Sequence, residues 1–204
     1  MGIHDERLLT PATVVTVVRT VASLALSLQA AAEGSLRLLV VALAVYWVGD
    51  ILDGAIARWR RCETRIGAVL DILSDRLNCA GFYLGVCWIE PSAVVPVGVY
   101  LLSFMVVDTF LSLAFLAWPI RSPNYFYAVD ERIWRWNWSK PAKAVNSAVF
   151  AVFLLVDGMW WVALAMAVAL LVLKTVSLTW LVRLGLPVPG EQPATTRPGS
   201  VHAR

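Results

Sequence analysis

Four aspartates in one short stretch of the chain have the spacing that metal-dependent chemistry requires. Asp50 and Asp53 are three residues apart, and Asp71 and Asp75 are four residues apart. On α-helices, residues three or four apart lie on one face, so each pair presents two carboxylates a turn apart. Carboxylates at close quarters repel one another unless cations lie between them, and ligand sets made only of oxygen favour Mg²⁺ or Mn²⁺ over zinc. We therefore predict a divalent-metal site carried by two helices.

Both aspartate pairs lie in apolar runs, where a charge is expensive to bury. A charged side chain at the centre of a membrane helix costs about 2.5 to 3.5 kcal/mol on insertion scales. The connection between the two runs is short, so the two helices must be antiparallel neighbours and the pairs must face each other. Interhelical polar clamps, or a cation pathway in a transporter, are the alternative interpretations. The connection and its flanks carry four arginines: Arg58, Arg60, Arg61 and Arg65.

The chain as a whole has the composition of a membrane protein. It has 204 residues, of which 59% are hydrophobic, and a mean hydropathy of +0.71. We predict an all-α membrane domain over residues 1–184, in which residues 1–10 lie at the membrane interface. The Pro- and Gly-rich segment 185–204 is predicted to be a disordered tail. Six transmembrane helices are expected, at Thr13–Ala32, Leu36–Ala57, Ile66–Ile89, Ala93–Trp118, Ala142–Val156 and Met159–Leu184.

The basic residues predict the orientation of these helices. They concentrate in the connection after the second run and in the one after the fourth, whereas the alternate connections carry a single base, Arg37. The positive-inside rule then places both termini, both basic loops and the aspartates at the cytosolic side. We expect a multi-pass protein of a bacterial-type inner membrane, with no nucleic-acid partner. The bases of the second loop are Arg121, Arg132, Arg135, Lys140 and Lys143.

The residues around the aspartates also match a known pattern. The chain reads Asp50-x-x-Asp53-Gly54-x-x-Ala57-Arg58, then eight residues, then Gly67-x-x-x-Asp71-x-x-x-Asp75. This run resembles, at every position and spacing, the signature of the CDP-alcohol phosphotransferase family, including the bacterial phosphatidylglycerophosphate and phosphatidylinositol phosphate synthases. The similarity is strongest over residues 46–75.

The resemblance implies roles for these residues. Two divalent ions, Mg²⁺ or Mn²⁺, would be held by Asp50, Asp53 and Asp71, and Asp75 would join the site and act as the general base. Arg58 would lie near the pyrophosphate of the substrate. The family pattern also implies a homodimer. The implied nucleotide pocket consists of Asp50, Gly54, Ala57, Arg58, Thr64 and Gly67.

The implied activity belongs to phospholipid biosynthesis. The phosphatidyl group of CDP-diacylglycerol would pass to a small phosphorylated alcohol, of the glycerol 3-phosphate or inositol phosphate class, with release of CMP. Transfer of a phospho-headgroup from a soluble CDP-alcohol to diacylglycerol is the alternative. The five bases of the second loop would attract a phosphorylated acceptor, although topology alone explains them equally well.

Three further charged residues, Arg19, Asp108 and Lys174, fall inside predicted spans. Such residues usually face the bundle interior and a partner, so each is expected to form either a structural pair or part of the acceptor pocket. Arg76 points about 100° away from Asp75 on its helix and is expected to serve packing. The tryptophan-rich segment 134–138 is interpreted as an aromatic belt at headgroup level.

Overall fold

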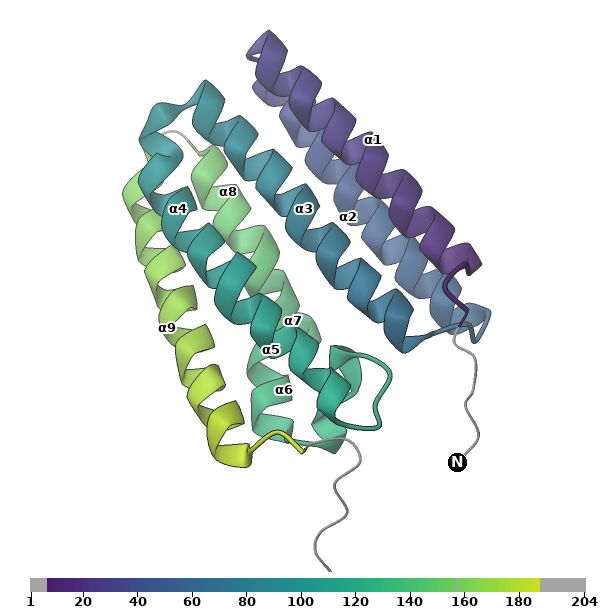
Figure 1. Cartoon of the computed structure of the whole chain (residues 1–204). Helices are drawn as coiled ribbons and strands as arrows, with labels where there is room; N and C mark the ends of the chain where they lie inside the picture. Colours follow the sequence, from purple (N-terminus) through teal and green to yellow (C-terminus); the bar gives the residue numbers. More distant parts are fainter. Residues whose placement is uncertain (1–6, 157, 188–204) are drawn as a thin grey trace, which may run out of the picture.

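The computed structural model describes residues 7–156 and 158–187, and within them every regular element is helical (Figure 1). The predicted interfacial segment 1–10 and tail 185–204 therefore lie mostly outside the described residues. The longer helices are α1 (Pro11–Glu33), α2 (Leu36–Trp59), α3 (Arg65–Ile89), α4 (Val94–Leu102) and α9 (Trp160–Leu184). The shorter ones are α5 (Thr109–Leu113), α6 (Glu131–Asn137), α7 (Lys140–Ala144) and α8 (Phe150–Leu155). Short stretches of 3₁₀ or π helix are η1 (Pro91–Ala93), η2 (Ser103–Asp108), η3 (Ala114–Ala117), η4 (Pro123–Ala128) and η5 (Val145–Val149).

Several of these elements join into longer rods. The segment from η1 to η3 forms one helical rod over Pro91–Ala117, and α7, η5 and α8 run on from one another. Four helical segments among the described residues are long and apolar enough to cross a membrane: Pro11–Glu33, Leu36–Trp59, Pro91–Ala117 and Trp160–Leu184. Of the six predicted spans, α3 carries too many charged residues to reach this apolarity, and the rod from α7 to α8 is short. These two spans remain predictions.

The helices run alternately up and down, as Figure 1 shows. Gly34 ends α1 in the left-handed conformation, with φ of 62°, and the Ser35 side chain then caps α2. The connection between α2 and α3 lies at the opposite end of the bundle. Both ends of the described chain lie at that same end (Figure 1). The aspartates of α2 and the aspartates of α3 are therefore brought side by side near this end.

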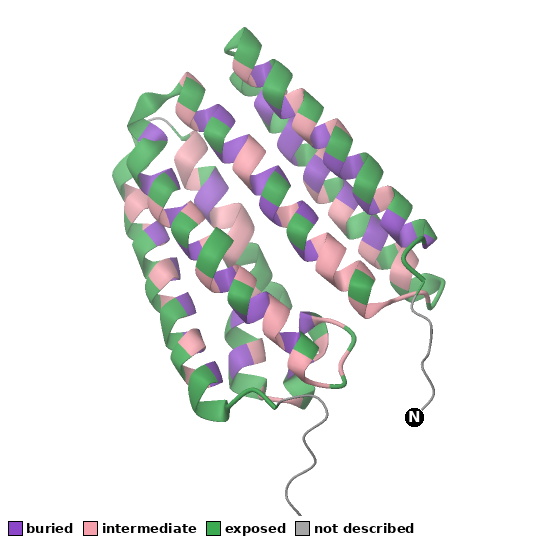
Figure 2. Ribbon diagram, viewed as in Figure 1, coloured by how far each residue is buried: buried purple, intermediate pink, exposed green. Residues whose placement is uncertain are grey.

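The buried face of α1 is made of small and polar residues, such as Thr16, Ser23, Ser27 and Ala30. Small residues let helix backbones approach closely, and hydroxyl groups can bond across the interface, as Ser23 does to the carbonyl of Ala42 at 3.0 Å. The large apolar residues of α1 point outward instead, and Figure 2 shows exposed residues along the outer faces of the helices. This inside-out pattern is what a lipid environment favours.

Two π-helical turns interrupt the second half of the bundle. They are η2, within the rod that follows α4, and η5, between α7 and α8. A π turn holds one residue more than an α turn and often marks a functional site. Both turns border the larger of the two cavities described below, to which they contribute Ser103, Asp108, Asn146 and Ser147.

Candidate active site

The four predicted aspartates converge, and a residue of α1 joins them. The Nη2 nitrogen of Arg19 lies 2.6 Å from Asp71 Oδ1, 3.1 Å from Asp75 Oδ1 and 3.3 Å from Asp50 Oδ1. Its Nε donates to Asp53 Oδ2 at 2.8 Å. One guanidinium thus contacts all four carboxylates, as expected for charges that face each other across antiparallel helices. The sequence indicated an interior partner for Arg19 but not which one.

The surroundings of Arg19 fix it in place. Its side chain is 2% exposed, and its stem lies against Gly49, where an added Cβ would come within 2.5 Å of the Arg19 Cβ. The Tyr46 ring lies beside the guanidinium, with its centroid 5.3 Å away. Thr16 donates to the same Asp53 oxygen at 2.7 Å. Gly49 is therefore required for the close approach of α1 to α2 at this point.

The carboxylates are close enough to share a cation. Asp50, Asp53 and Asp71 each offer an oxygen, and these oxygens all lie within 4.8 Å of one another. A donor set of carboxylate oxygens at this separation fits Mg²⁺ or Mn²⁺, which prefer oxygen ligands. Asp75 is one turn further along α3 and lies 24% exposed beside the same guanidinium.

A smaller cavity, of about 90 Å³, opens on one side of the aspartates. Thr64 caps α3 by accepting from the Gly67 amide at 3.0 Å, and a Cβ at Gly67 would come within 2.8 Å of the Thr64 hydroxyl oxygen. Arg58 folds back along Gly54, whose missing Cβ leaves that space to the guanidinium. Five of the residues predicted for a nucleotide pocket line this cavity, namely Gly54, Ala57, Arg58, Thr64 and Gly67, and Asp53 and Asp71 line it as well.

One residue that lines the smaller cavity makes a contact with a distant part of the chain. The Tyr125 hydroxyl, in η4, donates to Glu63 at 2.7 Å, and Glu63 lines the cavity. This hydrogen bond to a carboxylate raises the pKa of the Tyr125 phenol. The contact ties the turn between α2 and α3 to the basic loop. Nothing in the sequence pattern predicted this pairing, because the two residues are far apart along the chain.

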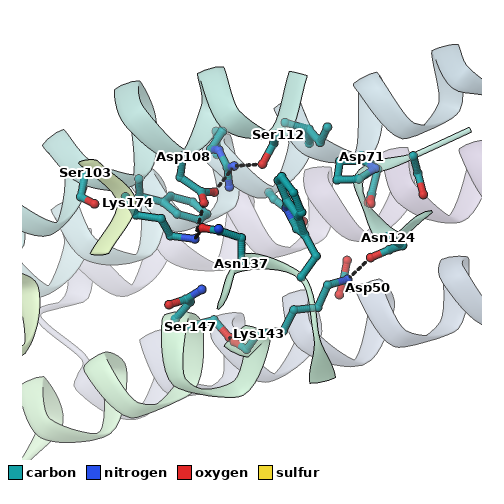
Figure 3. A pocket seen from close by; sticks show the side chains of 18 of the residues that line it. Asp50, Asp71, Ser103, Asp108, Ser112, Asn124, Asn137, Lys143, Ser147 and Lys174 are labelled. Carbon is teal, nitrogen blue, oxygen red and sulfur yellow. Dashed lines mark hydrogen bonds and ion pairs between the residues drawn. The ribbon is translucent and has the colours of Figure 1, made fainter. Parts of the chain in front are cut away.

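A larger cavity, of about 200 Å³, opens on the other side of the aspartates. Asp50, Asp71 and Asp75 line it, and Figure 3 shows Asp50 and Asp71 at one side and Asp108 and Lys174 at the opposite side. Asp71 borders both cavities, whereas Asp75 borders only the larger one. The two cavities therefore meet at the carboxylates. Asp50, predicted for the nucleotide pocket, lines the larger cavity instead.

The five bases of the second loop do not form a single basin. Lys143 lines the larger cavity, where its Nζ donates to Asn124 Oδ1 at 2.6 Å (Figure 3), and Arg121 lines the smaller one. The guanidinium of Arg132 instead stacks over the Trp180 ring at 4.4 Å. Arg135 and Lys140 line neither cavity. Of the five predicted acceptor residues, only Lys143 and Arg121 therefore line either of these two cavities.

A second buried charge cluster lies across the larger cavity from the aspartates. Asp108 of η2 pairs with Arg76 of α3 at 2.5 Å and with Lys174 of α9 at 2.6 Å. Lys174 also donates to Asn137 of α6 at 2.9 Å, and Asn137 donates to Ser177 at 3.0 Å. Arg76 stacks over the Phe104 ring at 3.7 Å. The sequence indicated interior partners for Asp108 and Lys174, and packing for Arg76, but not that the three pair with one another.

Two polar side chains of the larger cavity, those of Asn146 and Ser122, lack a hydrogen-bond partner among the described residues. Both side-chain amide atoms of Asn146, in η5, are buried without a hydrogen bond among the described residues. The backbone carbonyl of Asn146, by contrast, accepts from the Tyr100 hydroxyl at 3.1 Å. A buried amide left unpaired costs roughly 1 to 3 kcal/mol. Ser147 lines the cavity beside it (Figure 3). This part of the cavity wall is therefore equipped to hydrogen-bond a polar ligand.

Comparison with known proteins agrees with this arrangement. The family model for CDP-alcohol phosphatidyltransferase matches residues 9–180, and the chain belongs to this family. It is 40% identical over 75 residues to proteins named phosphatidylinositol phosphate synthase from Mycobacterium tuberculosis (strain ATCC 25618 / H37Rv) and Mycobacterium bovis (strain BCG / Pasteur 1173P2). The protein of the same name from Mycolicibacterium smegmatis is 36% identical over 75 residues.

These matches are partial. The aligned segment covers 37% of this chain and about a third of each relative, 35% for the two Mycobacterium proteins and 34% for the third. No solved structure matches the chain. The family resemblance that the aspartate pattern predicted is confirmed, and with it the class of transferases.

Proposed function

We propose that this protein transfers the phosphatidyl group of CDP-diacylglycerol to a small phosphorylated alcohol and releases CMP. The observation that carries the proposal is the meeting of two cavities at Asp71, with the other aspartates beside it. A transfer between two substrates needs two binding spaces that share a reacting centre. The names of the mycobacterial relatives favour an acceptor of the inositol phosphate class over glycerol 3-phosphate.

The aspartates are proposed to hold two divalent ions, Mg²⁺ or Mn²⁺. Asp50, Asp53 and Asp71 supply the group of neighbouring oxygens, and Asp75 completes the set. Ions bound there would neutralise the pyrophosphate of the donor and stabilise CMP as the leaving group.

The nucleotide half of the donor is assigned to the smaller cavity. Gly54, Ala57 and Gly67 keep its walls free of large side chains, and the Arg58 guanidinium lies against Gly54. Arginine is suited to phosphate because its planar donor fork matches two oxygens at once. The cytidine would lie in this cavity with its pyrophosphate directed towards Asp53 and Asp71.

The acceptor is assigned to the larger cavity. Lys143 and Asn124 form a polar pair near its aspartate side, suited to a phosphate, and the unpaired amide of Asn146 can bond a hydroxyl. Asp75, which borders this cavity alone, is proposed as the general base. The acceptor oxygen would attack the phosphorus of the phosphatidyl group and pass its proton to Asp75. The bond from that phosphorus to the CMP oxygen breaks, and CMP leaves.

The membrane arrangement is proposed from the fold and the charges together. Residues 1–184 form one membrane domain in which α3 and the rod of α7, η5 and α8 add two crossings to the four apolar ones. An even number of crossings agrees with the ends of the described chain lying at one end of the bundle, which the basic loops assign to the cytosol. We propose a homodimer in a bacterial-type inner membrane.

The test is CMP release by the purified full chain in detergent or nanodiscs. CDP-diacylglycerol with inositol phosphate should release CMP when Mg²⁺ or Mn²⁺ is present and not in excess EDTA. Parallel reactions with glycerol 3-phosphate, inositol or serine rank the acceptors. Turnover only of CDP-choline or CDP-ethanolamine with diacylglycerol would replace the proposal with headgroup transfer. No CMP from any of these donors would exclude both.

A further inference from the structure

The contacts of Arg19 point to a role that the proposed transfer does not assign to it. Three carboxylate oxygens, from Asp50, Asp71 and Asp75, surround its Nη2 nitrogen at 2.6 to 3.3 Å. This is the arrangement of ligands around a cation, with a side-chain nitrogen at its centre. The remaining carboxylate, Asp53, is engaged by Nε.

We propose that Arg19 is a built-in competitor of the divalent metal ions and sets the affinity of the aspartate site for them. The inference rests on the proposed metal site. Mg²⁺ binds oxygen at about 2.0 to 2.1 Å. An ion held by the same oxygens that surround Nη2 would lie in contact with that nitrogen, cation against cation. Metal binding through these oxygens therefore requires the guanidinium to turn away.

The position of the side chain is built into the fold. Gly49 provides the space for the Arg19 stem, and Thr16 shares the Asp53 oxygen with it. The guanidinium nevertheless leaves its Nη1 buried without a hydrogen-bond partner among the described residues. A donor held in this way is not fully satisfied, which lowers the cost of moving the guanidinium when a metal ion arrives.

The charges give the direction of the effect. One guanidinium faces four carboxylates, so the cluster stays strongly anionic and still attracts divalent ions. A unit positive charge in contact with the ligands nonetheless opposes every ion that binds there, and in a partly buried site this repulsion is only weakly screened. Removal of Arg19 should therefore tighten metal binding. If its role were only to hold the ligands in position, its removal would weaken binding, typically by 10- to 100-fold.

The test is Mn²⁺ binding to the full chain without substrate, followed by the electron paramagnetic resonance signal of free Mn²⁺. Arg19→Gln should lower the Mn²⁺ dissociation constant by about tenfold or more. Arg19→Lys, which keeps the charge, should stay closer to the unsubstituted protein. The matched control is Arg183→Gln, since Arg183 is exposed in the last turn of α9 and should have no effect.

A second variant leaves every charge in place. Gly49→Ala puts a Cβ against the Arg19 stem and should displace the guanidinium, so it should also tighten Mn²⁺ binding. Its control is Gly98→Ala, because a Cβ at Gly98 meets nothing within 4 Å. An unchanged or weaker affinity in the folded Arg19 and Gly49 variants would overturn the inference and leave the metal site standing. Absence of Mn²⁺ binding in the unsubstituted protein would instead refute the metal site.

Discussion

Two clusters of charged side chains lie on opposite sides of one cavity, and their net charges have opposite signs. The aspartate cluster of α2 and α3 has four carboxylates around one guanidinium, that of Arg19. The Asp108 cluster has two cations, Arg76 and Lys174, around one carboxylate. Each lies among helices that must otherwise be apolar.

The two clusters differ in whether each charged group has its own ion-pair and hydrogen-bond partners. In the Asp108 cluster each carboxylate oxygen has its own cation, and both cations make further hydrogen bonds, for example from Lys174 to Asn137. In the aspartate cluster one nitrogen is divided among three carboxylates. A network in which every polar group has its own partner serves structure, whereas carboxylates that share a single nitrogen keep oxygen lone pairs for a further cation.

The largest expected effect is the loss of activity when an aspartate of the first cluster is replaced. Asp75→Asn should lower the rate of CMP release by about 10²- to 10⁴-fold, the usual contribution of a general base. Its unfolding temperature should not fall, because the substitution removes one of several mutually repelling carboxylates. Turnover and thermal unfolding in detergent, measured on one preparation, check both statements. A stable, fully active variant would remove Asp75 from the reaction.

The opposite behaviour is expected across the cavity. Asp108→Asn leaves Arg76 and Lys174 buried without a counter-charge, which should cost about 3 to 5 kcal/mol of stability. The measurement is a denaturant titration in mixed micelles, with Asp75→Asn as the reference. If Asp108→Asn unfolded at the same denaturant concentration as the unsubstituted protein, the Asp108 cluster would not be a structural clamp.

Two asparagines sharpen the contrast on a smaller scale. Asn137 accepts from Lys174, so Asn137→Ala should cost about 1.5 to 3 kcal/mol of stability, as expected for a hydrogen bond to a charged group. For Asn146, whose side-chain amide has no protein partner, we expect an effect on acceptor binding and not a loss of stability. Asn146→Ala removes a buried unpaired amide, so it should not lower stability, and it should raise the KM of the acceptor but not that of the donor. Equal destabilisation by both substitutions would contradict this distinction.

The smallest effect concerns the basic loop. Lys143→Ala should raise the KM of a phosphorylated acceptor roughly three- to tenfold, corresponding to about 1 kcal/mol for a solvent-exposed charge contact. Arg132→Ala should leave this KM unchanged, because its guanidinium stacks on Trp180 outside both cavities. High salt should reduce the effect of Lys143→Ala. A larger effect for Arg132 would show that the loop acts as one electropositive surface.

The aspartate site could be predicted because its information is local. Asp50 with Asp53, and Asp71 with Asp75, are each spaced by one helical turn, and the short turn between the helices leaves a single way to pair them. The contact of Arg19 with these residues spans up to 56 positions along the chain, and no periodic pattern specifies such a partner. The same holds for Lys174 and Asn137, which are 37 residues apart.

The prediction of helices succeeded where apolar runs are long and less well where they are interrupted. The runs that became α1, α2 and α9 predicted each of these helices to within a few residues. The predicted fifth span, by contrast, contains the π turn η5, and the fourth contains η2. The mean hydropathy of a run carries no signal for an extra residue in one turn, since a single residue hardly changes that mean.

The two π turns also bear on how this cavity can change over evolutionary time. An extra residue rotates all that follows it by about 100° about the helix axis. Loss of one residue from Ser103–Asp108 would restore a regular helix and turn Asp108, with the residues that follow it, relative to Arg76. Loss of one from Val145–Val149 would do the same for Asn146. Single-codon deletions, and not only substitutions, are thus a direct route by which a protein of this architecture can acquire a new acceptor.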